Sequence, residues 1–168
     1  LQDKEYRTSK DLKTNTNAYI QSIEFDGGKL TGERIDFSSS MNNLVGIRGS
    51  GKSSIIEAIR YALDLPSNMD SQYKDHLVKE LFGSAGKITL TALDRTGKEF
   101  RIEKVYGHST QIYADGELRH VNIQSILNKP IYFGQKDLSN YDKDFEEKLI
   151  SQLLADKTQD VREKIKDK

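Results

Sequence analysis

The chain has no cysteine, no tryptophan and only two prolines among its 168 residues. The lack of cysteine excludes disulfide bonds and thiolate metal sites, and it fits a reducing compartment such as the cytoplasm, where we expect this protein. No run of about 18 apolar residues occurs, so the sequence predicts no membrane-spanning helix. Basic and acidic residues number 26 each, so the net charge gives no general argument for binding nucleic acid or a membrane.

Apolar residues are also scarce, at 35% of the chain, and the mean hydropathy is -0.70. These values are low for a self-contained α/β domain, because its parallel strands are buried on both faces. We therefore expect one domain, or one lobe of a larger one, with part of its core supplied by other polypeptide. The first residue is Leu1 rather than methionine, which suggests an excised piece of a longer protein.

What the chain does have is a complete phosphate-binding motif. Residues 46–53 read GIRGSGKS, which matches the pattern G-x-x-x-x-G-K-[ST]. The apolar residues 44–47 predict a buried strand before the loop, and a helical pattern follows it until Pro66. Five residues define the expected apolar face of that helix: Ile55, Ile56, Ile59, Ala62 and Leu63.

Each residue type in the loop has a chemical reason. Glycines permit the tight turn that brings backbone N–H groups to a phosphate chain at a helix N-terminus. Lys52 is expected to reach the β and γ phosphates and to act in catalysis, and the Ser53 hydroxyl is expected to ligate Mg²⁺. The predicted nucleotide-binding residues are Gly46, Arg48, Gly49, Ser50, Gly51, Lys52, Ser53 and Ser54. The alternative is a glycine-rich turn before an ordinary core helix.

Shorter patterns predict the surrounding elements. A strand over 18–26 and a returning strand over 29–37 form a hairpin around the turn at residues 26–28. A short helix through Leu77 to Phe82 stops at Gly83. Further strands are expected over 87–94, 99–106, 110–114 and 131–133, the first three as an antiparallel meander, with a short helix over 121–127 and a helix over 142–168.

The chain has no evident aspartate of the kind that ATP hydrolysis requires. A P-loop ATPase needs an aspartate after a buried strand to hold Mg²⁺. The only apolar run that ends in an acid is residues 88–94, but its alternation indicates a half-exposed strand and Asp94 precedes the turn sequence Arg95-Thr96-Gly97-Lys98. We therefore interpret Asp94 as a hairpin corner and expect the missing acid on another segment.

The order of these parts resembles the N-terminal half of an SMC-like or SbcC-like ABC ATPase head. The resemblance rests on the P-loop ending in GKSS and on residues 131–138, IYFGQKDL, in which Gln135 looks like the Q-loop glutamine. It implies an α/β P-loop fold with parallel core strands plus an antiparallel β subdomain. The lobe would cover residues 18–156, after a linker over 1–17 and before the start of a coiled coil or truncated helix over 157–168.

The resemblance also implies a chemistry and a set of partners. ATP and Mg²⁺ would be the cofactors, and Gln135 would complete the Mg²⁺ coordination and position the attacking water. The C-terminal half of the same head would supply the remaining catalytic groups, and two heads would form a homodimer around ATP. The implied settings are DNA repair, chromosome maintenance or anti-phage defence, with ATP hydrolysis by the complete head.

Two details refine the resemblance. Arg48 stands where many members carry asparagine. The segments GIRGSGKSS and YFGQKDLS resemble those of TrlF-type AAA-like ATPases, in which a PHP phosphoesterase domain precedes the ATPase. DNA contact would fall on the antiparallel subdomain, but acids interrupt its basic residues and favour a solvated mixed face. The basic residues are Lys87, Lys98, Arg101, Lys104, Arg119 and His120, and the acids are Glu99, Glu103 and Asp115.

Two other functions stay open on the sequence. One is a free-standing P-loop NTPase or kinase with a lid over residues 67–83. The other is a clamp that uses ATP only to dimerise and does not hydrolyse it.

Overall fold

The computed structural model describes residues 17–66, 71–83, 85–132 and 150. The chain divides into two compact units, Leu1–Tyr132 and Phe133–Lys168, and every described residue except Ile150 belongs to the first. The predicted linker, Gln135, the C-terminal helix and the lobe boundary at residue 156 lie outside the described residues and stay predictions.

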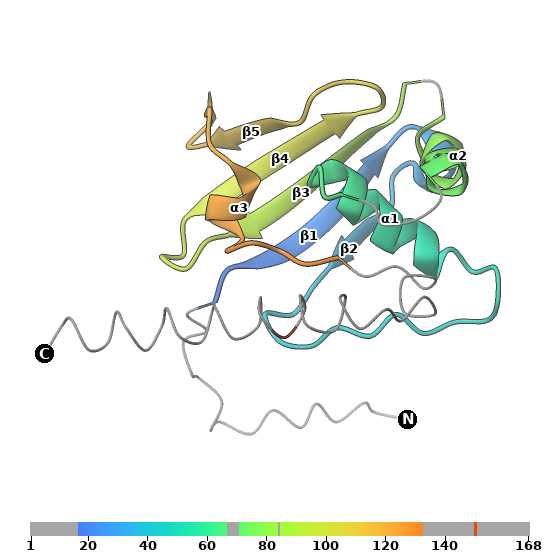
Figure 1. Ribbon diagram of the computed structural model, residues 1–168, viewed down its shortest axis with the longest axis horizontal. Coiled ribbons are helices and arrows are strands. Elements are labelled where there is room, and N and C mark those ends of the chain that lie inside the picture. The colour runs from blue at the N-terminus through green and yellow to red at the C-terminus, as the bar shows by residue number, and fades with distance from the viewer. Residues whose placement is uncertain (1–16, 67–70, 84, 133–149, 151–168) are drawn as a thin grey trace, which may run out of the picture. The chain divides into compact units, whose positions relative to one another are not determined.

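The first unit contains a six-stranded sheet with the order β2-β1-β3-β4-β5-β6 (Figure 1). The strands are β1 (Tyr19–Asp26), β2 (Arg34–Asp36), β3 (Lys87–Leu93), β4 (Glu99–Val105), β5 (Gln111–Ala114) and β6 (Glu117–Leu118). The helices are α1 (Lys52–Ala62), α2 (Ser71–Phe82) and α3 (Ile123–Ile126), with a 3-10 turn η1 (Gly28–Leu30). The predicted hairpin, meander and short helices are thus confirmed, but the returning strand expected over 29–37 covers only Arg34–Asp36, because the chain first forms the turn η1.

The hairpin and the meander are not separate, because β1 pairs with β3 and joins them into one sheet. Every pairing between the described strands is antiparallel. The parallel core strands that the resemblance implied are therefore not found in this part of the chain, which holds the antiparallel portion of the lobe and the P-loop helix.

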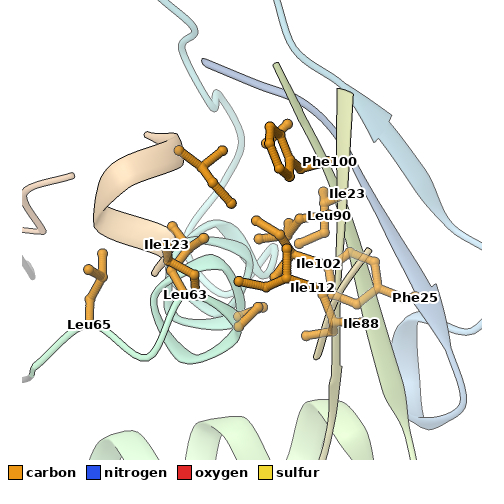
Figure 2. Packing of buried hydrophobic residues seen from close by; sticks show 14 of the residues in the cluster. Ile23, Phe25, Leu63, Leu65, Ile88, Leu90, Phe100, Ile102, Ile112 and Ile123 are labelled. Atoms are coloured by element: carbon orange, nitrogen blue, oxygen red, sulfur yellow. The ribbon is translucent and has the colours of Figure 1, made fainter. Parts of the chain in front are cut away.

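The core lies between one face of the sheet and the helices. Cross-strand register places Ile23, Leu90, Ile102 and Ile112 in one row, and all four are buried. Figure 2 shows Leu63, which follows α1, and Ile123 from α3 facing this row. The next row, Glu24, Thr89, Glu103 and Gln111, lies on the opposite face because neighbouring side chains alternate. One polar face explains part of the low apolar content.

The C-terminal end of α1 is fixed to the sheet by polar contacts as well as by packing. Lys104 is buried on the core face of β4, bonds to the carboxylate of Asp64 and lies 5.0 Å from the centre of the Tyr61 ring. The Tyr61 hydroxyl accepts a hydrogen bond of 3.0 Å from the Gly107 N–H. A cation at a helix C-terminus also complements the helix dipole.

The predicted buried strand over residues 44–47 is wrong. These residues have no strand pairing, and Val45 and Ile47 are 93% and 84% exposed. A strand exists only where a neighbour supplies backbone partners, and the described residues contain none for this segment. Residues 44–47 are apolar, as a buried strand requires, but the described part of the chain holds no strand that pairs with them.

Two further predictions need correction, the first for the same reason and the second for a different one. Ile131 and Tyr132, the described part of the predicted strand over 131–133, are not in a strand, and Ile131 is 40% exposed. On α1 the predicted apolar face is wrong at Ile56, which is 40% exposed, while Glu57 and Arg60 are buried instead. The helix is rotated toward a polar contact that hydrophobic periodicity does not show.

The interpretation of Asp94 as a hairpin corner is confirmed. Its Oδ1 atom accepts hydrogen bonds from Thr96 N (2.8 Å), Thr96 Oγ1 (2.6 Å) and Lys98 N (2.9 Å). Partial burial raises the pKa of Asp94, but these bonds outweigh it and hold the pKa below the ordinary 3.8. The carboxylate therefore stabilises the turn between β3 and β4 through these hydrogen bonds.

The Asp94 turn predicts a pH-dependent contribution to stability. We expect Asp94→Ala to lower the free energy of unfolding at pH 7 by about 1–2 kcal/mol, because three hydrogen bonds to a carboxylate are lost. Since the folded pKa is depressed, this contribution is present above the unfolded pKa and is lost as pH falls through the folded value. Urea unfolding of both proteins at pH 7 and near pH 3 measures the difference; an equal difference at both values would contradict the prediction.

A close backbone approach at Gly28 gives a second prediction. A Cβ there would lie 1.7 Å from the Leu81 carbonyl oxygen of α2, and φ is +73°. Gly32 has a similar φ of +80° but open space around it. We expect Gly32→Ala to cost about 1 kcal/mol from backbone strain alone, and Gly28→Ala to cost more than about 2 kcal/mol because α2 must also move. Equal thermal unfolding of the two variants would contradict this packing.

Candidate nucleotide-binding site

The loop before α1 has a shape that depends on its glycines. Gly49 and Gly51 have φ values of +83° and +87°, which residues with a side chain rarely adopt. Gly46 is restricted by space instead, because a Cβ there would lie 2.6 Å from Ser50 Oγ. The Ser50 N–H also donates to the Ile47 carbonyl at 3.2 Å, which closes the turn. The loop therefore curls back on itself within six residues.

Lys52 places its ammonium group inside this curl. Lys52 Nζ donates to the carbonyl oxygens of Gly46 and Ile47, both at 2.7 Å, and to Ser50 Oγ at 3.1 Å. The cation is therefore held beside the loop backbone rather than extended into solvent. Gly46, Ser50 and Lys52 are brought together as the motif predicts.

The N-terminus of α1 carries no group that would compete with an anion. Its N-cap is Gly51, which has no side chain to cap the helix, and the first turn contains no acidic residue. The first N–H groups of a helix have no partner within it, and the helix dipole places partial positive charge there. Lys52, Ser53 and Ser54 begin the helix, so their N–H groups and the Lys52 ammonium face the same end.

This donor set fits a phosphate chain with a magnesium ion. The loop supplies backbone N–H groups and one ammonium, which are the groups that hold phosphate oxygens. The Ser53 hydroxyl is a hard oxygen ligand of the kind Mg²⁺ accepts beside phosphates. Arg48 is exposed in the loop and adds a second cation near the same end. Gln135, the other predicted Mg²⁺ ligand, is outside the residues that the structure describes.

A buried polar cluster on α1 was missed by the sequence reasoning. Arg60 Nε donates to Glu57 Oε2 at 2.7 Å, and both side chains are less than 10% exposed. The Tyr132 hydroxyl donates to the other oxygen of Glu57, and Arg60 Nη1 donates to the Leu65 carbonyl at 2.8 Å. The available signal was an acid and a base at i and i+3 within residues 55–63, which are otherwise mostly apolar.

Large apolar side chains lie uncovered around the loop. Val45 precedes it, Ile47 lies within it, Ile56 lies on α1, and Ile131 lies on the chain after α3. Isolated exposed apolar residues are ordinary, but several on and around one glycine-rich loop and its helix indicate a surface that something else covers.

The basic residues of the sheet are largely engaged. Lys98 pairs with Asp115 at 2.9 Å, Arg119 with Glu117 at 2.8 Å and Arg101 with Glu103 at 3.4 Å, while Lys104 is buried. The hydrogen bond from Lys98 also lowers the pKa of Asp115. The expected solvated mixed face is therefore confirmed for Lys98, Arg101 and Arg119, and it is wrong for Lys104, which is buried on the core face of the sheet.

Among the described residues, no group of three His, Cys, Asp or Glu side chains is placed to hold a metal ion. No helix in that same part of the chain is both long enough and apolar enough to cross a membrane.

Comparisons with known proteins agree with this site. Residues 18–168 match the AAA domain family. A stretch of 71 residues is 37% identical to the "DNA double-strand break repair Rad50 ATPase" of Sulfurisphaera tokodaii, and covers 42% of this chain and 8% of that protein. The chain thus spans only a small part of the curated relative's length.

A solved structure from work on "ATP-driven dimerization and DNA stimulated activation of SMC ATPases" has a similar fold. Its TM-score is 0.53 at 17% sequence identity, over 80% of this chain and 99% of that one. Because the family match spans most of the sequence, the chain belongs to the AAA domain family, and it has the fold of the N-terminal lobe of an SMC-like ATPase head.

Proposed function

We propose that this chain binds ATP and Mg²⁺ as the N-terminal lobe of an SMC-like ATPase head. The observation that carries the proposal is the curled loop whose lysine ammonium and free helix N-terminus face the same end. Membership of the AAA domain family supports a nucleotide as the ligand. A glycine-rich turn of purely structural use would need neither Lys52 inside the curl nor an uncapped helix.

The residues of the loop divide the work of binding. The N–H groups of the loop and of the first helical turn hold phosphate oxygens, and Lys52 exchanges loop carbonyls for the β and γ phosphates. Arg48, Gly49, Ser50 and Ser54 line the same end. Ser53, with Gln135 as the second predicted ligand, would hold Mg²⁺, which neutralises charge that develops on the phosphates during transfer.

Hydrolysis needs groups beyond the described residues. Asp94, the one acid after an apolar run, is fixed in a turn, so the Mg²⁺-binding acid and a catalytic base come from another segment. The exposed Val45, Ile47, Ile56 and Ile131 support the same conclusion, because a lobe that worked alone would cover them. We assign both roles to the C-terminal half of the head, whose strands would pair with residues 44–47.

The wider role follows from the relatives. The relative from Sulfurisphaera tokodaii is a DNA double-strand break repair Rad50 ATPase, and the structural neighbour comes from work on the ATP-driven dimerization of SMC ATPases. We therefore propose that this protein forms a homodimer around ATP and acts in DNA repair or a related process. Chromosome maintenance and anti-phage defence, the upstream PHP-type domain and the coiled coil stay predictions. Since four sheet cations are paired or buried, we expect DNA to contact other surfaces.

The first test is nucleotide binding by the full-length protein. We expect Lys52→Ala to weaken ATP affinity between about tenfold and a hundredfold, because charge-assisted hydrogen bonds contribute about 1.5–3 kcal/mol. Lys98→Ala is the matched control, since Lys98 is an exposed lysine paired with Asp115. Isothermal titration of the three proteins measures the effect. Equal affinity in Lys52→Ala and wild type would reject the site.

The second test separates the head from the alternatives. We expect the 168-residue chain to bind ATP with little turnover, and the full-length protein to hydrolyse it and to dimerise with ATP in light scattering. Robust turnover by the 168-residue chain alone would instead favour a free-standing NTPase or kinase. ATP-dependent dimers of the full-length protein without phosphate release would favour the non-hydrolysing clamp.

A further inference from the structure

The ammonium group of Lys52 uses all of its hydrogen-bonding capacity inside the loop. An ammonium carries three donors and no acceptor. Lys52 Nζ donates to the carbonyl oxygens of Gly46 and Ile47, both at 2.7 Å, and to the hydroxyl oxygen of Ser50 at 3.1 Å. A phosphate that binds this ammonium must therefore replace at least one acceptor that belongs to the chain itself.

The three acceptors differ in how easily a phosphate can replace them. The Ile47 carbonyl also accepts a bond of 3.2 Å from the Ser50 N–H, so it belongs to the turn that closes the loop. The Gly46 carbonyl precedes it in the same backbone. Ser50 Oγ makes the longest of the three bonds, and a serine hydroxyl moves away by rotation about one side-chain bond. The hydroxyl is therefore the acceptor that a phosphate replaces first.

The first glycine of the motif permits the contact between Ser50 and Lys52. A Cβ on Gly46 would lie 2.6 Å from Ser50 Oγ and 3.8 Å from Lys52 Nζ. Gly46 does not have the positive φ of Gly49 and Gly51, so glycine is needed here for space and not for backbone conformation. The hydroxyl and the ammonium thus meet in space that is free because residue 46 has no side chain.

The Ser50 hydroxyl and a phosphate oxygen compete for the same donor. Hydrogen bonds to a charged oxygen are roughly twice as strong as those between neutral groups, so a phosphate displaces the hydroxyl. The free energy of the lost bond between Lys52 and Ser50 nevertheless opposes binding. When a protein must leave a preferred internal arrangement to bind a ligand, its apparent affinity is reduced by the fraction of molecules that are competent to bind.

We propose that the Ser50 side chain acts through Lys52 to limit the affinity of the loop for nucleotide. Its hydroxyl occupies the donor of the Lys52 ammonium that a phosphate oxygen takes first. The inference rests on the proposed nucleotide site and deepens it. It also separates two roles of one residue, because the Ser50 N–H belongs to the phosphate-binding backbone while the hydroxyl opposes binding.

The test is Ser50→Ala in the full-length protein. This change removes the hydroxyl but keeps the N–H of residue 50 and both carbonyl acceptors of Lys52. We expect isothermal titration with ATP and Mg²⁺ to show an affinity about threefold to tenfold higher than that of wild type, because one internal hydrogen bond no longer opposes binding. Lower affinity would show that the hydroxyl holds the nucleotide, and unchanged affinity would show that it does not compete. Either result overturns the proposal.

Ser50→Thr tests whether the hydroxyl is the group responsible. Residue 50 has no positive φ, so threonine is compatible with the backbone, and it restores the acceptor oxygen. We expect its affinity to stay within about twofold of wild type, a rescue that a general loosening of the loop would not show. Ser109→Ala is the matched control, because Ser109 is exposed in the turn between β4 and β5. A gain in Ser50→Thr equal to that in Ser50→Ala would contradict the proposal.

A double-mutant cycle tests the route through Lys52. In a Lys52→Ala background, we expect Ser50→Ala to change ATP affinity by less than about twofold, because no ammonium is left to release. A full gain in that background would show that Ser50 acts independently of Lys52 and would overturn the proposal. If wild-type protein does not bind ATP, or if Lys52→Ala binds it as tightly as wild type, the nucleotide site itself is wrong and both proposals fall.

Discussion

The structure depends on the contrast between the two ends of α1. The N-terminal end has no side-chain cap and no acid, so its N–H groups and its positive partial charge are available to a ligand. The C-terminal end is crowded with partners: Arg60 bonds to the Leu65 carbonyl, and the buried Lys104 holds Asp64. A helix fixed at one end can present the other to an anion without losing its place.

The sheet provides the surface on which that helix is fixed. Its core face carries Ile23, Leu90, Ile102 and Ile112 in one row, and Lys104 of β4 reaches the end of α1 from the same face. The opposite face is polar, and its cations are mostly paired with neighbouring acids. The sheet therefore holds α1 in place through its core face, while most cations on its opposite face are already paired with acids.

Local signals predicted the elements whose stability is local. The P-loop and α1 follow from a glycine, lysine and serine pattern with a helical period behind it, and the β3–β4 turn follows from Asp94 and Gly97. The sequence failed where a structure depends on a distant partner. Residues 44–47 and 131–132 are apolar, but a strand needs a neighbour for its backbone groups, and none is available among the described residues.

The site was predictable to a similar degree. The loop residues are where the motif requires. Hydrophobic periodicity did not predict the buried Glu57–Arg60 pair, because it assigns charged residues to the exposed face of a helix. The partner of Glu57, Tyr132, is 75 positions away, so no local pattern could reveal it. The pairing of β1 with β3, which merges two predicted units, is also set by contacts far apart in sequence.

The central claim is that the loop and the first turn of α1 hold the phosphates of a nucleotide. The most direct measurement is a backbone amide NMR titration of the protein with ATP and Mg²⁺. We predict the largest chemical-shift changes at the amides of residues 49–54, with little change in β5 and β6. Saturable ATP binding that leaves those six amides unmoved, or no binding by a folded protein, would contradict the account.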